Sequence, residues 1–553
     1  MTLSDYNIWL NEENLDAELK AQLMDMSQSE IKDAFFKHLE FGTAGARQLM
    51  GPGINRLNIY TVKRLALGFA KYIKLISKSN NRSVAISYDN RINSKRFAYT
   101  CARVLAAEGI KTFITKDLRP TPYLSYMVRH FHCDGGIMIT ASHNPKEYNG
   151  FKAYDHTGAQ LVPKLADRLT KEIKKITSYF YIQERLSDLI VEIDETFDIL
   201  YLNEVKQVQL RHLEKPLHFI YSPLHGTGST LMPKLIEEVG YKFYYNEPEM
   251  INDGAFPNTK SSNPEEKEAY ENSLILAKEH NAAAVLVTDP DADRLGLMVK
   301  HKDKYVFLNG NQTASLEAYY ILSTLKETNK LPKDGMIYMS NVTTPLLKDI
   351  AQSFGVGVKE VLTGFKYIGE QIEKSDKPYL FGAEESYGSL IKPFVRDKDA
   401  LQAVLLLVEM ITYYHMKNLS LYDVLLSIYQ QLATYSEQTI SLTYRGIEGN
   451  NQIKKIMAYF REKPLLLEDE PLDYYEDFQA GVKIKNNQKT PLDFDYANML
   501  KFNYQSGHQV ILRPSGTEPK LKIYLYIKAD SLKEAKDKLK TIKTTITTKI
   551  KEI

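Results

Sequence analysis

The chain has very little cysteine, because Cys101 and Cys133 are the only two among its 553 residues. This argues against a disulfide framework and predicts a reducing, cytoplasmic location. It also lacks a hydrophobic run that could cross a bilayer, since Gln402 and Glu409 interrupt the most apolar stretch, 400–413. The first thirty residues contain neither a basic segment nor an apolar core, so we expect no secretory signal.

The chain carries no excess of charge of either sign. Its 71 Lys and Arg residues face 69 Asp and Glu residues, which leaves a formal net charge of +2. Such a chain has no net attraction to nucleic acid or to a membrane surface, and we expect neither as a partner. The hydrophobic fraction of 43% and the charged fraction of 25% are typical of globular proteins and exclude a disordered or collagen-like chain. The length predicts three to four domains of about 150 residues.

Strands and helices alternate after an N-terminal segment that we expect to be helical to about residue 40. The stretch 94–108 predicts a helix with Ser94 as its N-cap, and a second helix should open at Pro-Thr-Pro 120–122. Short apolar stretches predict strands at 84–88, 111–115, 136–140, 217–221 and 336–339. This order predicts an α/β architecture.

Three sections share a further pattern, in which an apolar strand ends in a polar loop and a second strand returns. The three loops are 141–150, 289–294 and 382–388. We interpret the pattern as a threefold internal repeat, although the alternative stays open that any α/β chain offers such groups. The last section differs, since it ends in a Lys-rich amphipathic helix from Ser531 whose lysines we interpret as a solvated face.

These observations predict the domain organisation. We expect three related α/β domains with mixed sheets and a C-terminal α+β domain, arranged around a central cleft. The predicted boundaries are 1–210, 211–309, 310–434 and 435–553.

The strongest chemical signal is an acidic loop with carboxylates at Asp289, Asp291 and Asp293. Alternate residues of an extended segment share one side, and a bend at Pro290 would let their oxygens converge on a hard cation such as Mg²⁺. An EF-hand is excluded, because Arg294 and Lys300 stand where glycine and glutamate are needed. A solvated acidic turn is the alternative, but the preceding apolar run 282–287 disfavours it.

Other loops give weaker signals. Ser142 ends an apolar strand with His143 and Lys152 nearby, and could be a nucleophile or phosphoryl carrier, although a structural turn explains the loop equally well. Arg513, with hydroxyl side chains two and four residues further on, could bind phosphate, or the loop could be a capped turn. The loops 41–47, 382–388 and 396–399 also fit either ligand contact or an ordinary turn, and they contain small residues, a Glu-Glu-Ser-Tyr run and an Arg-Asp-Lys-Asp run.

In combination, these loops resemble the α-D-phosphohexomutases, a family that includes phosphoglucomutase and phosphomannomutase. Four motifs occur in order within 41–522. They are TASHNP with NGFK, similar to the family's phosphoserine loop, DPDADR, similar to its metal loop, AEESYG, similar to its sugar loop, and RPSGTEP, similar to its phosphate loop. The sugar loop resembles that of phosphoglucomutases, while DPDADR and TGFKYIG (363–369) resemble the branch with phosphopentomutase-like enzymes. Ala383 and Ala400 stand where glycine is usual, which leaves the fine sugar specificity open.

The resemblance implies a role for individual residues. The implied catalytic residues are Ser142, His143, Arg47, Lys152 and Lys398. The implied ligands of Mg²⁺ are Ser142, as phosphoserine, with Asp289, Asp291 and Asp293. The implied substrate-binding residues are Thr43, Arg294, Thr363, Gly364, Lys366, Glu384, Ser386, Arg513, Ser515, Gly516 and Thr517.

The resemblance also implies an activity. We expect a mutase that interconverts glucose 1-phosphate and glucose 6-phosphate through a phosphoserine, with glucose 1,6-bisphosphate as intermediate and activator. Pentose and mannose phosphates are the alternative substrates, and a phosphosugar hydrolase or a non-catalytic phosphosugar-binding protein are the rival functions. The expected partner is a small phosphorylated sugar, and the expected oligomeric state is monomer or homodimer.

Overall fold

The computed structural model describes residues 2–42, 45–444, 446–468, 470–515 and 520–553. The chain forms two compact units. The first comprises the residues up to 313 together with 365–420, and the second comprises 314–364 together with 421–553. Each unit is described by itself.

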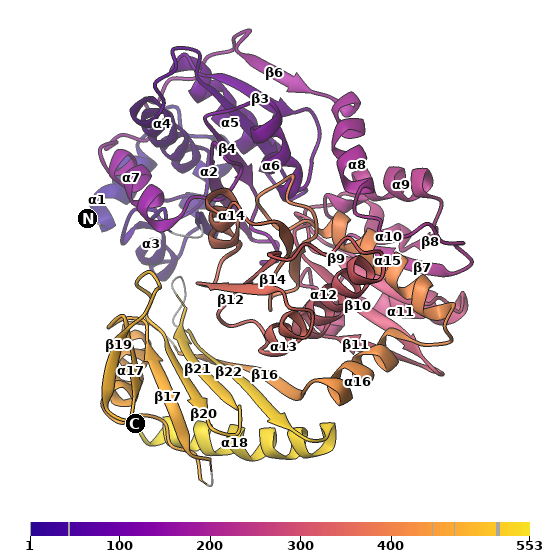
Figure 1. Cartoon of the computed structure of the whole chain (residues 1–553). Helices are drawn as coiled ribbons and strands as arrows, with labels where there is room; N and C mark the ends of the chain where they lie inside the picture. The colour runs from indigo at the N-terminus through magenta and orange to yellow at the C-terminus, as the bar shows by residue number, and fades with distance from the viewer. Residues whose placement is uncertain (1, 43–44, 445, 469, 516–519) are drawn as a thin grey trace. The chain divides into compact units, whose positions relative to one another are not determined.

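The first unit contains a six-stranded mixed sheet (Figure 1). Its order is β1 (Ala46–Leu49), β5 (Tyr148–Asp155), β4 (Gly135–Ile139), β2 (Ser83–Tyr88), β3 (Lys111–Thr115) and β6 (Ile190–Ile193). Strands β4, β2, β3 and β6 are parallel, whereas β1 and β5 run antiparallel to their neighbours. Parallel strands with helical connections need cover on both faces. One face packs against α4 (Ile59–Ile76), α5 (Ser94–Ala107) and α7 (Pro163–Lys174), and α6 (Thr121–His130) packs against β2 and β4 from the other side.

One local expectation about a helix start was wrong, while the expected helical character of the N-terminal segment is confirmed. Asn93, not Ser94, is the N-cap of α5, and Ser94 instead donates its hydroxyl to Oδ1 of the buried Asp89 at 2.6 Å. The N-terminal segment is three helices, α1 (Thr2–Leu10), α2 (Ala17–Met24) and α3 (Gln28–Phe35). The side chains of Asp16 and Ser27 accept backbone N–H groups there and begin new helices.

A second sheet in the same unit repeats the pattern of the first. Its order is β11 (Lys304–Leu308), β10 (Leu295–His301), β9 (Ala284–Thr288), β7 (His218–Ser222) and β8 (Lys242–Tyr245). Strands β9, β7 and β8 are parallel and β10 is antiparallel to β9, as β4, β2, β3 and β5 are in the first sheet. The helices of this part are α8 (Asp198–Lys206), α9 (Gly228–Val239), α10 (Glu247–Met250) and α11 (Glu271–Glu279).

The third section also contains a parallel pair of strands and an antiparallel hairpin, as the first two sheets do. In the second unit, β12 (Met336–Ser340) and β13 (Gly357–Val361) form a parallel pair. In the first unit, β14 (Tyr379–Glu384) and β15 (Gly388–Leu390) form an antiparallel hairpin. The helices of this section are α12 (Gly310–Glu327), α13 (Leu346–Ser353), α14 (Phe365–Lys374), α15 (Ala400–His415) and α16 (Leu421–Gln431). The expected three related α/β sections are therefore confirmed.

The C-terminal part of the second unit is an antiparallel sheet, gold to yellow in Figure 1. Its order is β16 (Thr434–Thr443), β22 (Lys520–Ala529), β21 (Gln509–Pro514), β20 (Leu500–Tyr504), β17 (Leu472–Asp477), β18 (Val482–Lys485) and β19 (Gln488–Pro491). Helix α17 (Gly446–Glu462) precedes β17, and α18 (Leu532–Glu552) packs against β16 and β22. The buried residues of α18 all belong to its predicted apolar stripe, and they are Ala535, Ile542, Ile546 and Ile550.

Two features agree with the composition. Among the residues that the structure describes, no helix is both long enough and apolar enough to cross a membrane. Cys101 and Cys133 are free thiols buried in the first unit.

Candidate active site

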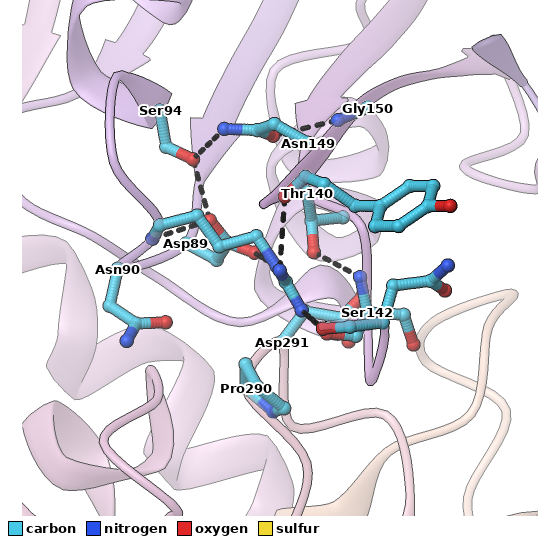
Figure 2. Close-up of polar contacts among 12 residues, drawn as sticks. Asp89, Asn90, Ser94, Thr140, Ser142, Asn149, Gly150, Pro290 and Asp291 are labelled. Atoms are coloured by element: carbon cyan, nitrogen blue, oxygen red, sulfur yellow. Dashed lines mark hydrogen bonds and ion pairs between the residues drawn. The ribbon is translucent and has the colours of Figure 1, made fainter. Parts of the chain in front are cut away.

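Ser142 lies in the loop that follows β4, and the fold holds it in an unusual conformation. Its φ of +53° is in the left-handed region, which costs a non-glycine residue about 1 to 2 kcal/mol. The hydroxyl of Thr140 accepts the Ser142 N–H at 2.8 Å, as Figure 2 shows. The Ser142 hydroxyl lies 3.0 Å from Oδ2 of Asp289 and 3.3 Å from Nδ1 of His143. Ser142 is 3% exposed, so its hydroxyl is held at a fixed place rather than in solvent.

The acidic loop that follows β9 is folded around its first carboxylate. Oδ1 of Asp289 accepts the backbone N–H groups of Asp293 and Arg294, each at 3.0 Å. Thr121, at the start of α6, donates its hydroxyl to Oδ2 of Asp291 at 2.8 Å and its N–H to the Asp291 carbonyl at 2.9 Å. The second sheet's loop is thereby fastened to an element of the first sheet, beside Ser142.

This loop can hold a metal ion. One carboxylate oxygen from each aspartate of the loop, 289, 291 and 293, lies within 4.8 Å of the others, and all three residues are buried. Among the described residues, Oδ1 of Asp291 and Oδ1 of Asp293 have no hydrogen-bond partner. Buried oxygens without a partner are costly, and a divalent cation with a preference for oxygen ligands would satisfy them. The residues therefore fit Mg²⁺.

Two lysines partly neutralise the acidic loop. Lys152, on β5, lies 2.8 Å from Oδ2 of Asp291 and 4.0 Å from Oδ2 of Asp293. Lys398 lies 3.1 Å from Oδ2 of Asp293 and 3.1 Å from Oδ1 of Asp397. Burial lowers the pKa of Lys398, but the two aspartates outweigh it and raise that pKa above its usual value. Lys398 thus stays protonated at neutral pH.

The carboxylates of the loop respond to their surroundings in opposite directions. Burial, followed by repulsion from Asp291 and Asp293, raises the pKa of Asp289 well above its usual value. Burial would also raise the pKa of Asp291, but the ammonium of Lys152 and the hydroxyl of Thr121 outweigh it and lower that pKa. The site therefore favours one ionised carboxylate strongly and penalises three charges together in the absence of a cation.

Arg47 and His143 line the Ser142 loop. Arg47, on β1, donates from Nη1 to Oδ1 of Asn144 at 2.6 Å. Burial, with repulsion from Arg294 and Arg47, lowers the pKa of His143 well below its usual value, so the imidazole is neutral at pH 7. Arg294 pairs with Glu265 at 2.5 Å.

The expected sugar loop lies in the same unit as Ser142. Glu384 ends β14 and is 5% exposed, and Ser386 lies in the turn before β15. A Cβ on Gly388 would lie 2.0 Å from Cδ of Lys398, so only glycine leaves room for this lysine to reach the acidic loop. Lys366, near the start of α14, is buried in the same unit.

The remaining predicted residues lie elsewhere. Thr363, Gly364, Arg513 and Ser515 belong to the second unit. Gly364 has a φ of +120°, Arg513 donates to the Tyr524 hydroxyl at 3.5 Å, and the Ser515 N–H donates to the Lys520 carbonyl at 2.8 Å. Thr43, Gly516 and Thr517 lie outside the described residues.

Several residues that brace the site are not among the predicted site residues. They include Thr121 and Thr140, described above, and the pair Asp89 and Arg91 after β2. Their signal in the sequence is shared: each polar residue ends an apolar strand or opens the next helix, at the sheet edge where ligands of open α/β sheets bind. Residues of the same types also occur in ordinary turns, so residue type alone does not identify such a site.

Three comparisons with known proteins find the same kind of relative. The family described as phosphoglucomutase/phosphomannomutase matches with its alpha/beta/alpha domains I, II and III, at residues 38–180, 200–302 and 309–431. A phosphoglucomutase of Staphylococcus haemolyticus (strain JCSC1435) is 34% identical over 539 residues, which cover 94% of this chain and 96% of that protein.

Solved structures show the same fold at lower identity. A phosphoglucomutase/phosphomannomutase family protein from Burkholderia thailandensis has a TM-score of 0.66 at 19% identity and covers 91% of this chain and 96% of its own. The open form of pp63/parafusin, a phosphoglucomutase from Paramecium, has a TM-score of 0.67 at 17% identity and covers 89% of this chain and 91% of its own.

Proposed function

Because the chain belongs to the phosphoglucomutase/phosphomannomutase family, we propose that it is a phosphosugar mutase that interconverts glucose 1-phosphate and glucose 6-phosphate. The reaction passes through a phosphorylated Ser142 and a sugar bisphosphate. The observation that carries the proposal is the Ser142 hydroxyl, which is buried and lies 3.0 Å from Asp289 of a triple-aspartate loop with two unpartnered oxygens.

The chemistry of the proposed reaction is a phosphoryl exchange. The bond between Oγ of phosphorylated Ser142 and phosphorus breaks, a bond forms between phosphorus and the free hydroxyl of the sugar monophosphate, and that hydroxyl loses its proton to a base. The proton taken by the base passes to the serine oxygen as it leaves. The sugar bisphosphate then reorients within the site, Oγ of Ser142 loses that proton and bonds to the phosphorus of the other phosphoryl group, and the bond from this phosphorus to the sugar oxygen breaks as that oxygen takes up the proton. Such transfers depend mainly on positioning and on stabilisation of negative charge.

A metal ion would be held by Asp289, Asp291 and Asp293 together with the phosphoserine oxygens. When bound, Mg²⁺ polarises the phosphoryl group and stabilises the serine oxygen as it leaves. We infer Mg²⁺ from the all-oxygen donor set and from the two buried carboxylate oxygens that accept no hydrogen bond.

The chain's own cations and acceptors supply the rest. Lys398 stays protonated because Asp293 and Asp397 raise its pKa against the effect of burial, so it suits charge stabilisation better than proton removal. The neutral His143 ring lies 3.3 Å from the Ser142 hydroxyl and can accept a proton. Arg47 adds positive charge beside the Ser142 loop, and Lys152 adds positive charge beside the acidic loop.

The substrate would be oriented by two further groups of residues. We propose that Glu384 and Ser386 bind sugar hydroxyls and that Arg294 and Lys366 also contact the substrate. Arg513, Ser515, Gly516 and Thr517 would bind the non-reacting phosphate, with Thr43, Thr363 and Gly364 also in contact with substrate. A distal phosphate grip that accepts both orientations explains how one serine can serve both ends of the sugar.

The proposed function includes an intermediate, a domain division, a cellular location and an oligomeric state. Glucose 1,6-bisphosphate is the proposed intermediate and activator, and the four predicted domains remain our division of the chain. We propose a cytoplasmic location, which the two reduced, buried thiols support. Monomer or homodimer remains the prediction for the oligomeric state.

The test of the proposed function is a comparison of substrates. The purified protein, with Mg²⁺ and a trace of glucose 1,6-bisphosphate, is assayed with glucose, mannose and ribose 1-phosphates. The highest kcat/KM for glucose 1-phosphate is expected. A lead for ribose 1-phosphate would keep the mechanism and move the enzyme to the pentose branch. Release of inorganic phosphate without isomer formation would replace the mutase with a hydrolase.

A further inference from the structure

We propose that Arg91 is a positioning residue that fixes the backbone of the Ser142 loop, and thereby aims the Ser142 hydroxyl at Asp289. The catalytic part of this inference rests on the proposed function, but the structural part does not. Arg91 follows β2 and is 2% exposed, and none of the recognised motifs contains it.

The guanidinium of Arg91 donates hydrogen bonds to several backbone carbonyls of the Ser142 loop. Nη2 donates to the carbonyl of Ser142 at 2.6 Å and also to the carbonyl of Asn144. Nη1 donates to the carbonyls of Pro145 at 2.8 Å and Tyr148 at 3.0 Å. One side chain thus satisfies four backbone carbonyls within seven residues, the first of which is the carbonyl of Ser142 itself.

The guanidinium is in turn held on its other edge. Nε of Arg91 lies 3.3 Å from Oδ2 of Asp89, and Oδ1 of Asp89 accepts the Arg91 N–H at 3.0 Å. The Ser94 hydroxyl donates to the same oxygen of Asp89, and Nδ2 of Asn149 donates to the Ser94 hydroxyl at 2.9 Å. Figure 2 shows this chain of contacts running from Asp89 through Ser94 to Asn149. The network therefore closes on β5, at the far end of the loop.

This arrangement matters because the loop contains a residue in a strained backbone conformation. Ser142 keeps a φ of +53°, which a serine adopts only under constraint from its surroundings. The planar fork of arginine can bond several acceptors in one plane, which the single ammonium of lysine cannot reproduce. Loss of the fork would take its donor from the buried carbonyl of Ser142, remove the contacts to the three partly buried carbonyls, and let the segment 142–148 rearrange.

Charge gives Arg91 a second influence on the site. Burial lowers the pKa of Arg91, while Asp89, Asp291 and Asp289 act to raise it. The guanidinium is therefore within electrostatic reach of the acidic loop, and its hydrogen bond to the Ser142 carbonyl makes it a fixed positive group next to the place where phosphoserine would form.

The experiment compares Arg91→Lys and Arg91→Gln with Arg64→Lys. Arg64 is also a buried arginine of the first unit that donates to a backbone carbonyl, that of Ile176 at 2.9 Å, but it packs on Tyr179 away from the Ser142 loop. We expect kcat to fall about 100-fold in both Arg91 variants with KM within about twofold of wild type, because misplaced reacting groups cost rate rather than ground-state binding. Arg64→Lys should keep kcat within about twofold per folded molecule.

A second readout is independent of activity. Hydrogen exchange followed by mass spectrometry should show faster exchange in peptides covering 140–150 for the Arg91 variants and no change there for Arg64→Lys. Ser94→Ala, which removes the two bracing bonds to Asp89 and Asn149 but leaves Arg91 in place, provides a milder variant if the others do not fold, with an expected kcat loss of about tenfold at unchanged KM.

The outcomes are separable. Full kcat in folded Arg91→Gln, or unchanged exchange of 140–150, would overturn the positioning role. A parallel rise in KM and loss of kcat in the Arg91 and Arg64 variants would assign Arg91 a merely structural role. If wild type shows no mutase activity while 140–150 loosens in the Arg91 variants, the proposed function fails and the positioning of Ser142 stands.

Discussion

Ser142 and Asp289 are 147 residues apart in the chain, yet the hydroxyl of one lies 3.0 Å from Oδ2 of the other. Each residue follows a strand of a different sheet, β4 for Ser142 and β9 for Asp289. The two sheets share a four-strand pattern in which β4 and β9 are equivalent, and the loops that follow these two strands meet at this contact. The contact between a nucleophile loop and an acidic loop is the structural basis of the proposed phosphoryl transfer.

The acidic loop should bind Mg²⁺ and be stabilised by it. Addition of Mg²⁺ at 100 times its Kd should raise the free energy of unfolding by about 2.7 kcal/mol through mass action. Tm is measured with Mg²⁺ present and again after EDTA has removed it, and the difference is the increase. Asp289→Asn should remove most of this increase, because Asp289 is one of three buried carboxylates in the cluster. An equal Tm shift in wild type and Asp289→Asn would place the cation elsewhere.

Gly388→Ala should lower kcat by displacing Lys398. The added Cβ would lie 2.0 Å from Cδ of Lys398, so the lysine must leave its contacts with Asp293 and Asp397. We expect kcat to fall about tenfold or more, equivalent to about 1.4 kcal/mol of transition-state stabilisation. Gly240→Asn is the control, since a Cβ there meets no atom within 4 Å and asparagine tolerates its φ of +75°. Unchanged kcat in Gly388→Ala would remove Lys398 from the mechanism.

The second unit contains a partly buried ionic group whose contribution should depend on pH. Glu360 lies 2.7 Å from Lys348 and 3.2 Å from Lys501. Burial would raise the pKa of Glu360, but the two lysines outweigh it and lower that pKa from 4.5 to about 2. The ionised carboxylate therefore stabilises the fold above the unfolded pKa, and this stabilisation disappears as the pH falls from about 5 to about 2.

Glu360→Gln should accordingly destabilise the second unit by about 3 kcal/mol at pH 7, at about 1.4 kcal/mol per pKa unit. Hydrogen exchange of peptides in 421–553, compared at pH 7 and pH 4 after correction for intrinsic exchange, measures the difference. The gap between variant and wild type should narrow at the lower pH. A gap that is independent of pH would contradict the assigned ion pairs.

The two thiols should be unreactive in the folded protein. Burial raises the pKa of the Cys133 thiol to about 12, and burial also raises that of Cys101. Since the thiolate is the reactive form, Ellman's reagent at pH 8 should label neither residue until a denaturant is added, and then both. Fast labelling of either thiol in native buffer would show that it is accessible.

The fold followed from the sequence where one signal dominated. Apolar strands such as 84–88 and 217–221 are regular enough to predict the sheets and the repeated unit. Helix starts were less certain, because a hydroxyl such as that of Ser94 can cap a helix or satisfy a buried carboxylate such as Asp89, and only tertiary structure decides which.

The site was predictable in part for a similar reason. The acidic loop stands out because three carboxylates in six residues repel unless something binds them. Arg91 and Thr121 do not stand out, since their partners are a backbone carbonyl of Ser142 and a carboxylate of Asp291, far along the chain. Residues that act through distant backbone groups leave no local pattern.

The most direct test of the account follows the phosphoryl group itself. The protein is phosphorylated with labelled glucose 1,6-bisphosphate, freed of excess sugar, and mixed with unlabelled glucose 1-phosphate and Mg²⁺ in a single turnover. The account predicts that the label leaves Ser142 and appears in sugar phosphate, while Ser142→Ala keeps its fold, takes up no label and shows no turnover. Mutase activity near the wild-type level in Ser142→Ala, or label released only as inorganic phosphate, would contradict it.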